Sequence, residues 1–81
     1  MAVQLQKMSP QDESTYYKVK VELKINPKTS EFAKELKLQV RRGIVTVEGK
    51  VPTEADSKAV ERIVLGVVDV SGVVNNLSVG N

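Results

Sequence analysis

The stretch that decides the fold is Leu36-Lys37-Leu38-Gln39-Val40-Arg41-Arg42-Gly43-Ile44-Val45-Thr46-Val47-Glu48-Gly49-Lys50-Val51. Apolar and polar side chains alternate on both sides of its middle, which is the pattern of two strands that each bury one face. Gly43 is free to take the positive φ that a tight turn needs. Residues 36–51 therefore predict a β-hairpin that turns at Arg42-Gly43.

A helix and a further strand are predicted after the hairpin. Pro52-Thr53-Glu54-Ala55-Asp56 is typical of a helix start, with the threonine as N-cap and the aspartate three residues later. Apolar side chains then recur at helical spacing until Gly66, which is expected to end the helix. Residues 70–79 predict a third strand. Because a strand, a helix and a strand form a βαβ unit, the third strand should run parallel to the second.

The region before the hairpin leaves two alternatives open. Ser9-Pro10-Gln11-Asp12 is typical of a helix start, with the serine as N-cap and the aspartate as the acidic partner of a capping box. Tyr16, Val19 and Leu23 then share one helical face. Residues 17–25 also alternate strictly, as a half-buried strand would, and Val and Tyr favour strands slightly. The local pattern alone does not choose between helix and strand.

Several motifs resemble the bacterial BON domain family. The glycine-strand-glycine block Gly43-Ile44-Val45-Thr46-Val47-Glu48-Gly49-Lys50-Val51 resembles the central signature of that family, and residues 52–56 resemble its helix start. Residues 70–79, with their Val-Val-Asn-Asn-Leu core, resemble its closing strand. The similarity covers roughly residues 12–79. The family usually has Gly at the position of Asp69, so the turn before the last strand is expected to use Gly72 instead.

The resemblance implies an α+β fold. Two helices would pack on one face of a three-stranded mixed sheet, in the order helix-strand-strand-helix-strand. It favours a helix for residues 10–25, in a single domain over residues 10–81, with residues 1–9 as an N-terminal tail or short edge strand. Such domains occur in cell-envelope, osmotic-stress and lipoprotein-type proteins, with proposed binding to phospholipid or protein partners.

The composition argues against catalysis. The chain has 81 residues, no Cys and no His, so it lacks disulfides, the usual zinc ligands and the commonest general base. A domain of this size also has little room for a deep pocket, and the resemblance carries over no catalytic residue. We therefore expect a non-catalytic module with no catalytic residue, no metal and no cofactor.

Charge is unevenly distributed along the chain. The net charge is +2, but residues 18–42 hold eight Lys or Arg against three Glu. Nucleic-acid binding is disfavoured, because the net charge is modest and the chain has only three aromatic side chains. No segment is long enough to be transmembrane, and the N-terminus does not resemble a signal peptide. The expected compartment is the periplasm or envelope if the domain is excised from an exported protein, and the cytoplasm if the chain is complete.

A candidate binding surface follows if residues 10–25 are helical. Tyr17, Val21 and Ile25 would then stack on the side opposite the buried face; we call these three residues the outer stripe. It would be flanked by three lysines, Lys18, Lys20 and Lys24. An apolar row edged with lysines suits an anionic phospholipid surface. The alternative is a protein–protein interaction or oligomerisation module in a multidomain protein. The oligomeric state itself is not predicted.

Two further pairs of residues are singled out. Arg41 and Arg42 at the hairpin are a candidate phosphate contact, although such pairs are more often a solvated turn. Gly43 and Gly49 are interpreted as structural glycines. Gly49 lies in mid-strand, where glycine is destabilising, and it indicates either a close backbone approach of a ligand or tight packing of one of the two helices over the sheet. We favour the packing interpretation.

Overall fold

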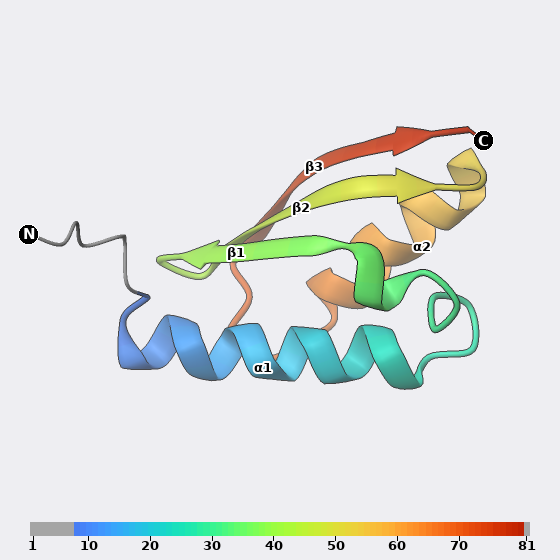
Figure 1. The fold of residues 1–81 in the computed structure, drawn as a ribbon. Coiled ribbons are helices and arrows are strands. Elements are labelled where there is room, and N and C mark those ends of the chain that lie inside the picture. Colours follow the sequence, from blue (N-terminus) through green and yellow to red (C-terminus); the bar gives the residue numbers. More distant parts are fainter. Residues whose placement is uncertain (1–7, 81) are drawn as a thin grey trace, which may run out of the picture.

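The computed structural model describes residues 8–80. Their elements in chain order are α1 (Pro10–Ile25), the short 3₁₀ helix η1 (Ala33–Glu35), β1 (Lys37–Arg41), β2 (Ile44–Val51), α2 (Glu54–Leu65) and β3 (Gly72–Val79). Both α-helices lie on the same face of the three-stranded sheet (Figure 1). The α+β fold predicted from the sequence is therefore confirmed. Residues 1–7 of the expected tail or edge strand lie outside the described residues.

The sheet is mixed, in the order β1-β2-β3. β1 and β2 are antiparallel, with Arg41 opposite Ile44, so Arg42 and Gly43 form a two-residue turn. Their φ angles of 54° and 81° are both positive, as in a type I′ hairpin turn. A Cβ on Gly43 would lie 2.8 Å from Ser71 Oγ, so both its φ and its surroundings favour glycine at this position. β2 and β3 are parallel, as the βαβ pattern predicted.

α1 is a helix throughout, which resolves the open alternative for residues 17–25. Ser9 is the N-cap, and its Oγ accepts a hydrogen bond from the backbone N–H of Asp12 at 3.1 Å. Thr15, Val19 and Leu23 form the buried face. The burial of that face outweighs the modest β preference of the local sequence.

α2 begins and ends as its sequence predicted. Thr53 and Asp56 form a reciprocal capping box, in which each side chain accepts from the other residue's backbone N–H. The C-cap is Gly66. Val60 and Val64 on this helix are fully buried against the sheet.

The hydrophobic core lies between the two helices and one face of the sheet. β2 supplies its centre, since Val45, Val47 and Val51 are 0%, 0% and 1% exposed. Leu23 of α1 and Val64 of α2 are buried in the same cluster. Each such side chain contributes roughly 1.5–3 kcal/mol relative to full exposure. No helix within residues 8–80 covers the opposite face of the sheet.

Two details differ from the predictions. The turn before β3 uses Asp69, whose φ is 77°, and not Gly72, which already pairs with Ile44. Asp tolerates this conformation better than most residues with a side chain. The tight approach predicted at Gly49 is present, but its neighbours are Leu36 and Glu35 and not a residue of α1 or α2.

Candidate functional site

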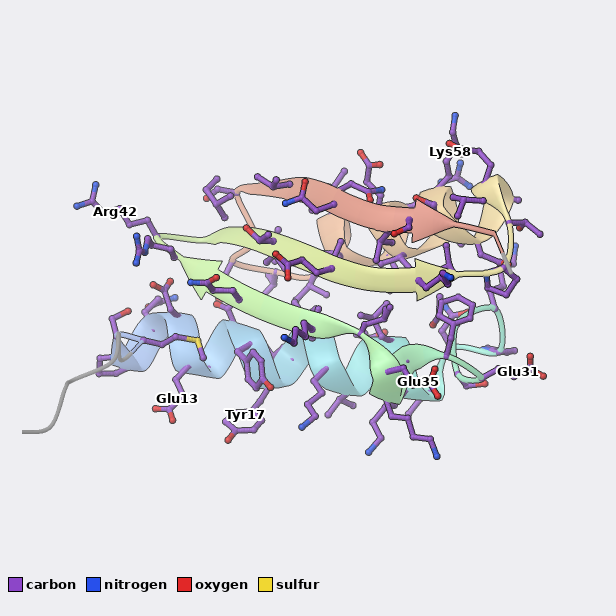
Figure 2. The ribbon with its side chains drawn as sticks, turned by 45° about the horizontal axis from the view of Figure 1, so that its top comes forward. Glu13, Tyr17, Glu31, Glu35, Arg42 and Lys58 are labelled. Carbon is purple, nitrogen blue, oxygen red and sulfur yellow. The ribbon has the colours of Figure 1, made fainter. Side chains whose placement is uncertain are left out.

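The outer stripe is exposed on α1. Tyr17, Val21 and Ile25 are 55%, 51% and 66% exposed, on the side of the helix opposite Val19 and Leu23. Figure 2 shows the Tyr17 side chain pointing away from the sheet. An apolar row of this kind on a helix marks a surface that can meet a membrane or a protein partner.

The two adjacent tyrosines have different positions. Tyr16 is half-buried and packs against the core, whereas Tyr17 belongs to the outer stripe. Their rings are edge to face, with centroids 5.1 Å apart and an interplanar angle of 80°. Such a contact is worth about 0.5–1.5 kcal/mol beyond area burial. Tyr16 therefore helps to position Tyr17 on the surface.

The three flanking lysines are not equivalent. Lys18 Nζ lies 3.3 Å from Asp69 Oδ2 in an exposed ion pair. Lys20 Nζ lies 5.7 Å from the centroid of the Tyr16 ring, a cation–π distance. Lys24 is exposed in the last turn of α1. The charges of Lys20 and Lys24 thus remain available to an anionic surface, while that of Lys18 is partly offset.

A shallow groove runs between α1 and α2, beside the outer stripe. Lys18 and Glu22 line it from one side and Arg62 from the other, and Val68 adds an apolar side chain that is 65% exposed. Sequence reasoning did not identify Val68, because it lies in the loop after α2 where no periodic pattern points to a face. The groove offers a mixed polar and apolar surface with charges of both signs.

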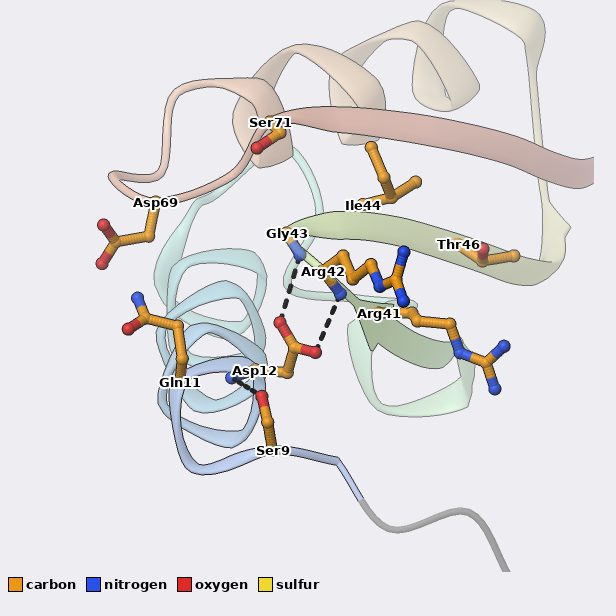
Figure 3. A pocket seen from close by; sticks show the side chains of 10 residues that line it. All are labelled: Ser9, Gln11, Asp12, Arg41, Arg42, Gly43, Ile44, Thr46, Asp69 and Ser71. Atoms are coloured by element: carbon orange, nitrogen blue, oxygen red, sulfur yellow. Dashed lines mark hydrogen bonds between the residues drawn. The ribbon is translucent and has the colours of Figure 1, made fainter.

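Arg41 is the last residue of β1, and Arg42 is the first residue of the hairpin turn. They line an open groove together with Asp12, Asp69 and Ser71 (Figure 3). Figure 2 shows Arg42 and Tyr17 pointing to different sides of the molecule, so the arginine pair is not part of the outer stripe. The phosphate contact at Arg41 and Arg42 stays a prediction, and the two aspartates in the same groove reduce its positive potential.

Asp12 has a role that the sequence did not reveal. Its carboxylate does not form the expected capping box but accepts the backbone N–H of Arg42 at 2.8 Å and of Gly43 at 3.1 Å (Figure 3). The hydrogen bond from Arg42 is the main reason that the pKa of Asp12 lies below its ordinary value of 3.8. Asp12 therefore clamps the start of α1 to the hairpin turn. An acidic residue near a helix start was the only signal in the sequence, and it indicated capping.

Within residues 8–80, no group of three or more acidic side chains is placed to hold a metal ion. In the same range neither helix is both long and apolar enough to span a bilayer. The features that stand out are surfaces: the outer stripe, the groove beside it and the hairpin end.

The described residues form a small α+β domain, with two helices on one face of a three-stranded mixed sheet and an apolar row exposed on α1. Comparison with protein-family models finds the BON domain over residues 12–81, nearly the whole chain. The chain belongs to the BON domain family. A comparison with curated proteins found no match. The family is one of non-catalytic binding domains of the envelope and stress kind, which identifies the chain as a binding module.

Proposed function

We propose that this domain binds anionic phospholipid surfaces through α1, with the outer stripe entering the headgroup region and the flanking lysines contacting phosphate groups. The observation that carries the proposal is the exposure of Tyr17, Val21 and Ile25 in one row along a helix. Tyr suits this region because its ring is apolar and its hydroxyl polar. The envelope association of the family is consistent with such a partner.

The expected attachment is weak and reversible. Each Lys near an anionic surface contributes about 1 kcal/mol, so Lys20 and Lys24 supply about 2 kcal/mol. Glu13 and Glu22 are exposed on the same helix and oppose part of this attraction. The outer stripe adds apolar burial, which does not depend on salt. Binding should therefore weaken at high salt, where the lysine contribution is screened.

Co-sedimentation with phosphatidylcholine vesicles, with and without phosphatidylglycerol, tests the proposal. Wild type should bind the mixed vesicles at low salt and not the neutral ones. Lys20→Glu/Lys24→Glu should lower the partition coefficient about tenfold or more, because two attractions become repulsions. Tyr17→Ser/Val21→Ser should also lower it, with less dependence on salt.

Matched controls separate a specific face from general charge. Lys37→Glu/Lys50→Glu changes the net charge equally, but on exposed strand positions away from α1. Val74→Ser removes an apolar side chain that is 43% exposed on the sheet. Both controls should bind nearly as wild type does. Equal losses in test and control variants would mean that α1 is not the membrane face.

A protein partner is the second candidate, and the charge balance of α1 favours it. The helix carries Lys18, Lys20 and Lys24 against Asp12, Glu13 and Glu22, three of each sign, so its formal charge is zero. The groove beside the outer stripe likewise contains both signs. If no form of the domain binds anionic vesicles even at low salt, this proposal replaces the first, and the outer stripe would then dock against a polypeptide.

A further inference from the structure

β3 is a long edge strand without charge. Residues 70–81 contain no charged side chain, whereas the opposite edge, β1, has only five residues and begins and ends with Lys37 and Arg41. Within the described part of the chain β3 pairs with β2 alone. Natural proteins usually protect an exposed edge with Lys, Pro, a bulge or shortness, because unpaired backbone groups recruit other strands. The charged ends and short length of β1 fit that pattern, and the eight residues of β3 do not.

The backbone direction at this edge follows from the register. Val51 is opposite Val79, and Gly80 N–H donates to Val51 O at 3.0 Å. In a parallel pair, alternate residues of a strand direct both backbone groups to the same neighbour. The even-numbered residues of β3 therefore face β2. Val73, Asn75, Leu77 and Val79 direct their N–H and C=O groups to the open side.

The side chains of β3 are incompletely covered. On the helix-facing side of the sheet, Val45, Val47 and Val51 of β2 are buried, but their register partners Val73 and Asn75 are only half-buried and Val79 is 44% exposed. On α2, which packs beneath β3, Leu65 is 50% exposed. The apolar core therefore extends to the β3 edge, where its side chains remain partly exposed to solvent.

One backbone N–H at the centre of this edge, that of Leu77, is already hydrogen-bonded to a side chain of β3 itself. Asn75 Oδ1 accepts the N–H of Leu77 at 3.0 Å. The amide of Asn75 is held in turn by α2, since Nδ2 donates to Ser57 Oγ at 3.0 Å and to Glu61 Oε1 at 3.2 Å. Asn75 therefore lies over the edge as a latch, and an incoming strand must displace it to reach Leu77.

We propose that the open edge of β3 is a self-association surface, in which two copies pair β3 to β3 in antiparallel orientation and Asn75 limits the strength of pairing. A two-fold axis normal to the sheet gives a six-stranded sheet with all helices on one face. A second copy is the expected partner, because pairing of two identical β3 strands brings no like charges together. β3 also has no charged side chain that would attract an oppositely charged segment of another protein. The second α2 would also cover the half-exposed apolar side chains at this edge.

Sedimentation velocity over a concentration series tests this. Asn75→Val should dimerise about tenfold more tightly than wild type or better, because Leu77 N–H becomes available once per copy. Ser57→Ala/Asn75→Val should do the same, and it avoids leaving the buried Ser57 hydroxyl without its partner. In the dimers, amide exchange at Val73 and Val79 should slow.

A charge at the strand centre supplies the decisive comparison. Asn76→Lys, added to Asn75→Val, places two lysines near the two-fold axis and should restore the monomer. Gln39→Lys, added to Asn75→Val, introduces the same charge at an exposed position of β1 and should leave the dimer intact. The proposal is overturned if both latch variants associate no more tightly than wild type, or if Asn76→Lys does not weaken the dimer.

Discussion

At Gly49, backbone conformation and packing both disfavour a side chain. Its φ of 137° lies in a region that residues with a Cβ rarely adopt. A Cβ there would lie 3.0 Å from Leu36 Cδ2 and 3.4 Å from Glu35 O. The close approach comes from the segment that leads into β1, so Gly49 lets that segment lie against the middle of β2.

Replacing Gly49 by Val should lower the free energy of unfolding by about 2–4 kcal/mol, since strain and overpacking combine. Urea unfolding followed by circular dichroism measures this. Gly80→Val is the matched control, because Gly80 has a similar φ of 129° but open space around its Cβ position. It should cost clearly less. If both variants lost the same free energy of unfolding, packing against Leu36 would not contribute to the effect.

At the scale of elements, the side chain of Asp12 joins the start of α1 to the hairpin turn by hydrogen bonds. The carboxylate of Asp12 accepts two backbone N–H groups across the turn, 30 and 31 residues further along the chain. Those N–H groups belong to Arg42 and Gly43, which face away from the β1–β2 ladder at a two-residue turn. The clamp therefore satisfies hairpin donors and sets where the helix lies along the sheet.

Asp12→Asn should destabilise the domain at neutral pH, because an amide oxygen replaces only one of two acceptors. The folded pKa of Asp12 is lowered, so its stabilisation is complete above pH 3.8 and is lost as the pH falls through the folded pKa. The urea midpoints of wild type and Asp12→Asn should therefore differ at pH 7 and converge in acid. Glu13→Gln, an exposed change in the same turn, should preserve the wild-type acid limb. Parallel pH profiles for wild type and Asp12→Asn would exclude this role of the carboxylate.

At the scale of the whole molecule, both helices share one core with the sheet. Leu23 of α1 and Val60 of α2 are buried against the same face as Val45 and Val47. Among the described residues, the buried apolar side chains form one cluster, and both helices depend on it. The domain is expected to unfold in a single cooperative transition.

Two probes can check that cooperativity. Tyr16 and Tyr17, both on α1, are the only tyrosines in a chain without Trp, so intrinsic fluorescence reports on that helix. Far-UV circular dichroism reports on all helices and strands. The two urea transitions should coincide. A tyrosine transition at lower urea would show that α1 leaves the sheet before the rest unfolds.

Locally encoded features were predictable from the sequence. The hairpin over residues 36–51 follows from the alternation of apolar and polar side chains. The place of its turn follows from Gly43, because glycine readily adopts the positive φ that a tight turn needs. The ends of α2 follow from the capping box at Thr53 and from Gly66. The outer stripe is also sequence-encoded once α1 is known to be helical, because it depends only on helical spacing.

Only the tertiary structure decided the remaining features. Residues 17–25 satisfy both helix and strand patterns, and burial of Val19 and Leu23 against the sheet selects the helix. Contacts between separate segments of the chain determine the partner of Asp12 and the neighbour of Gly49. The role of Asn75 as a latch depends on which edge of the sheet is left unpaired. Local propensity and spacing contain no information about such contacts, because they arise only when the core brings the segments together.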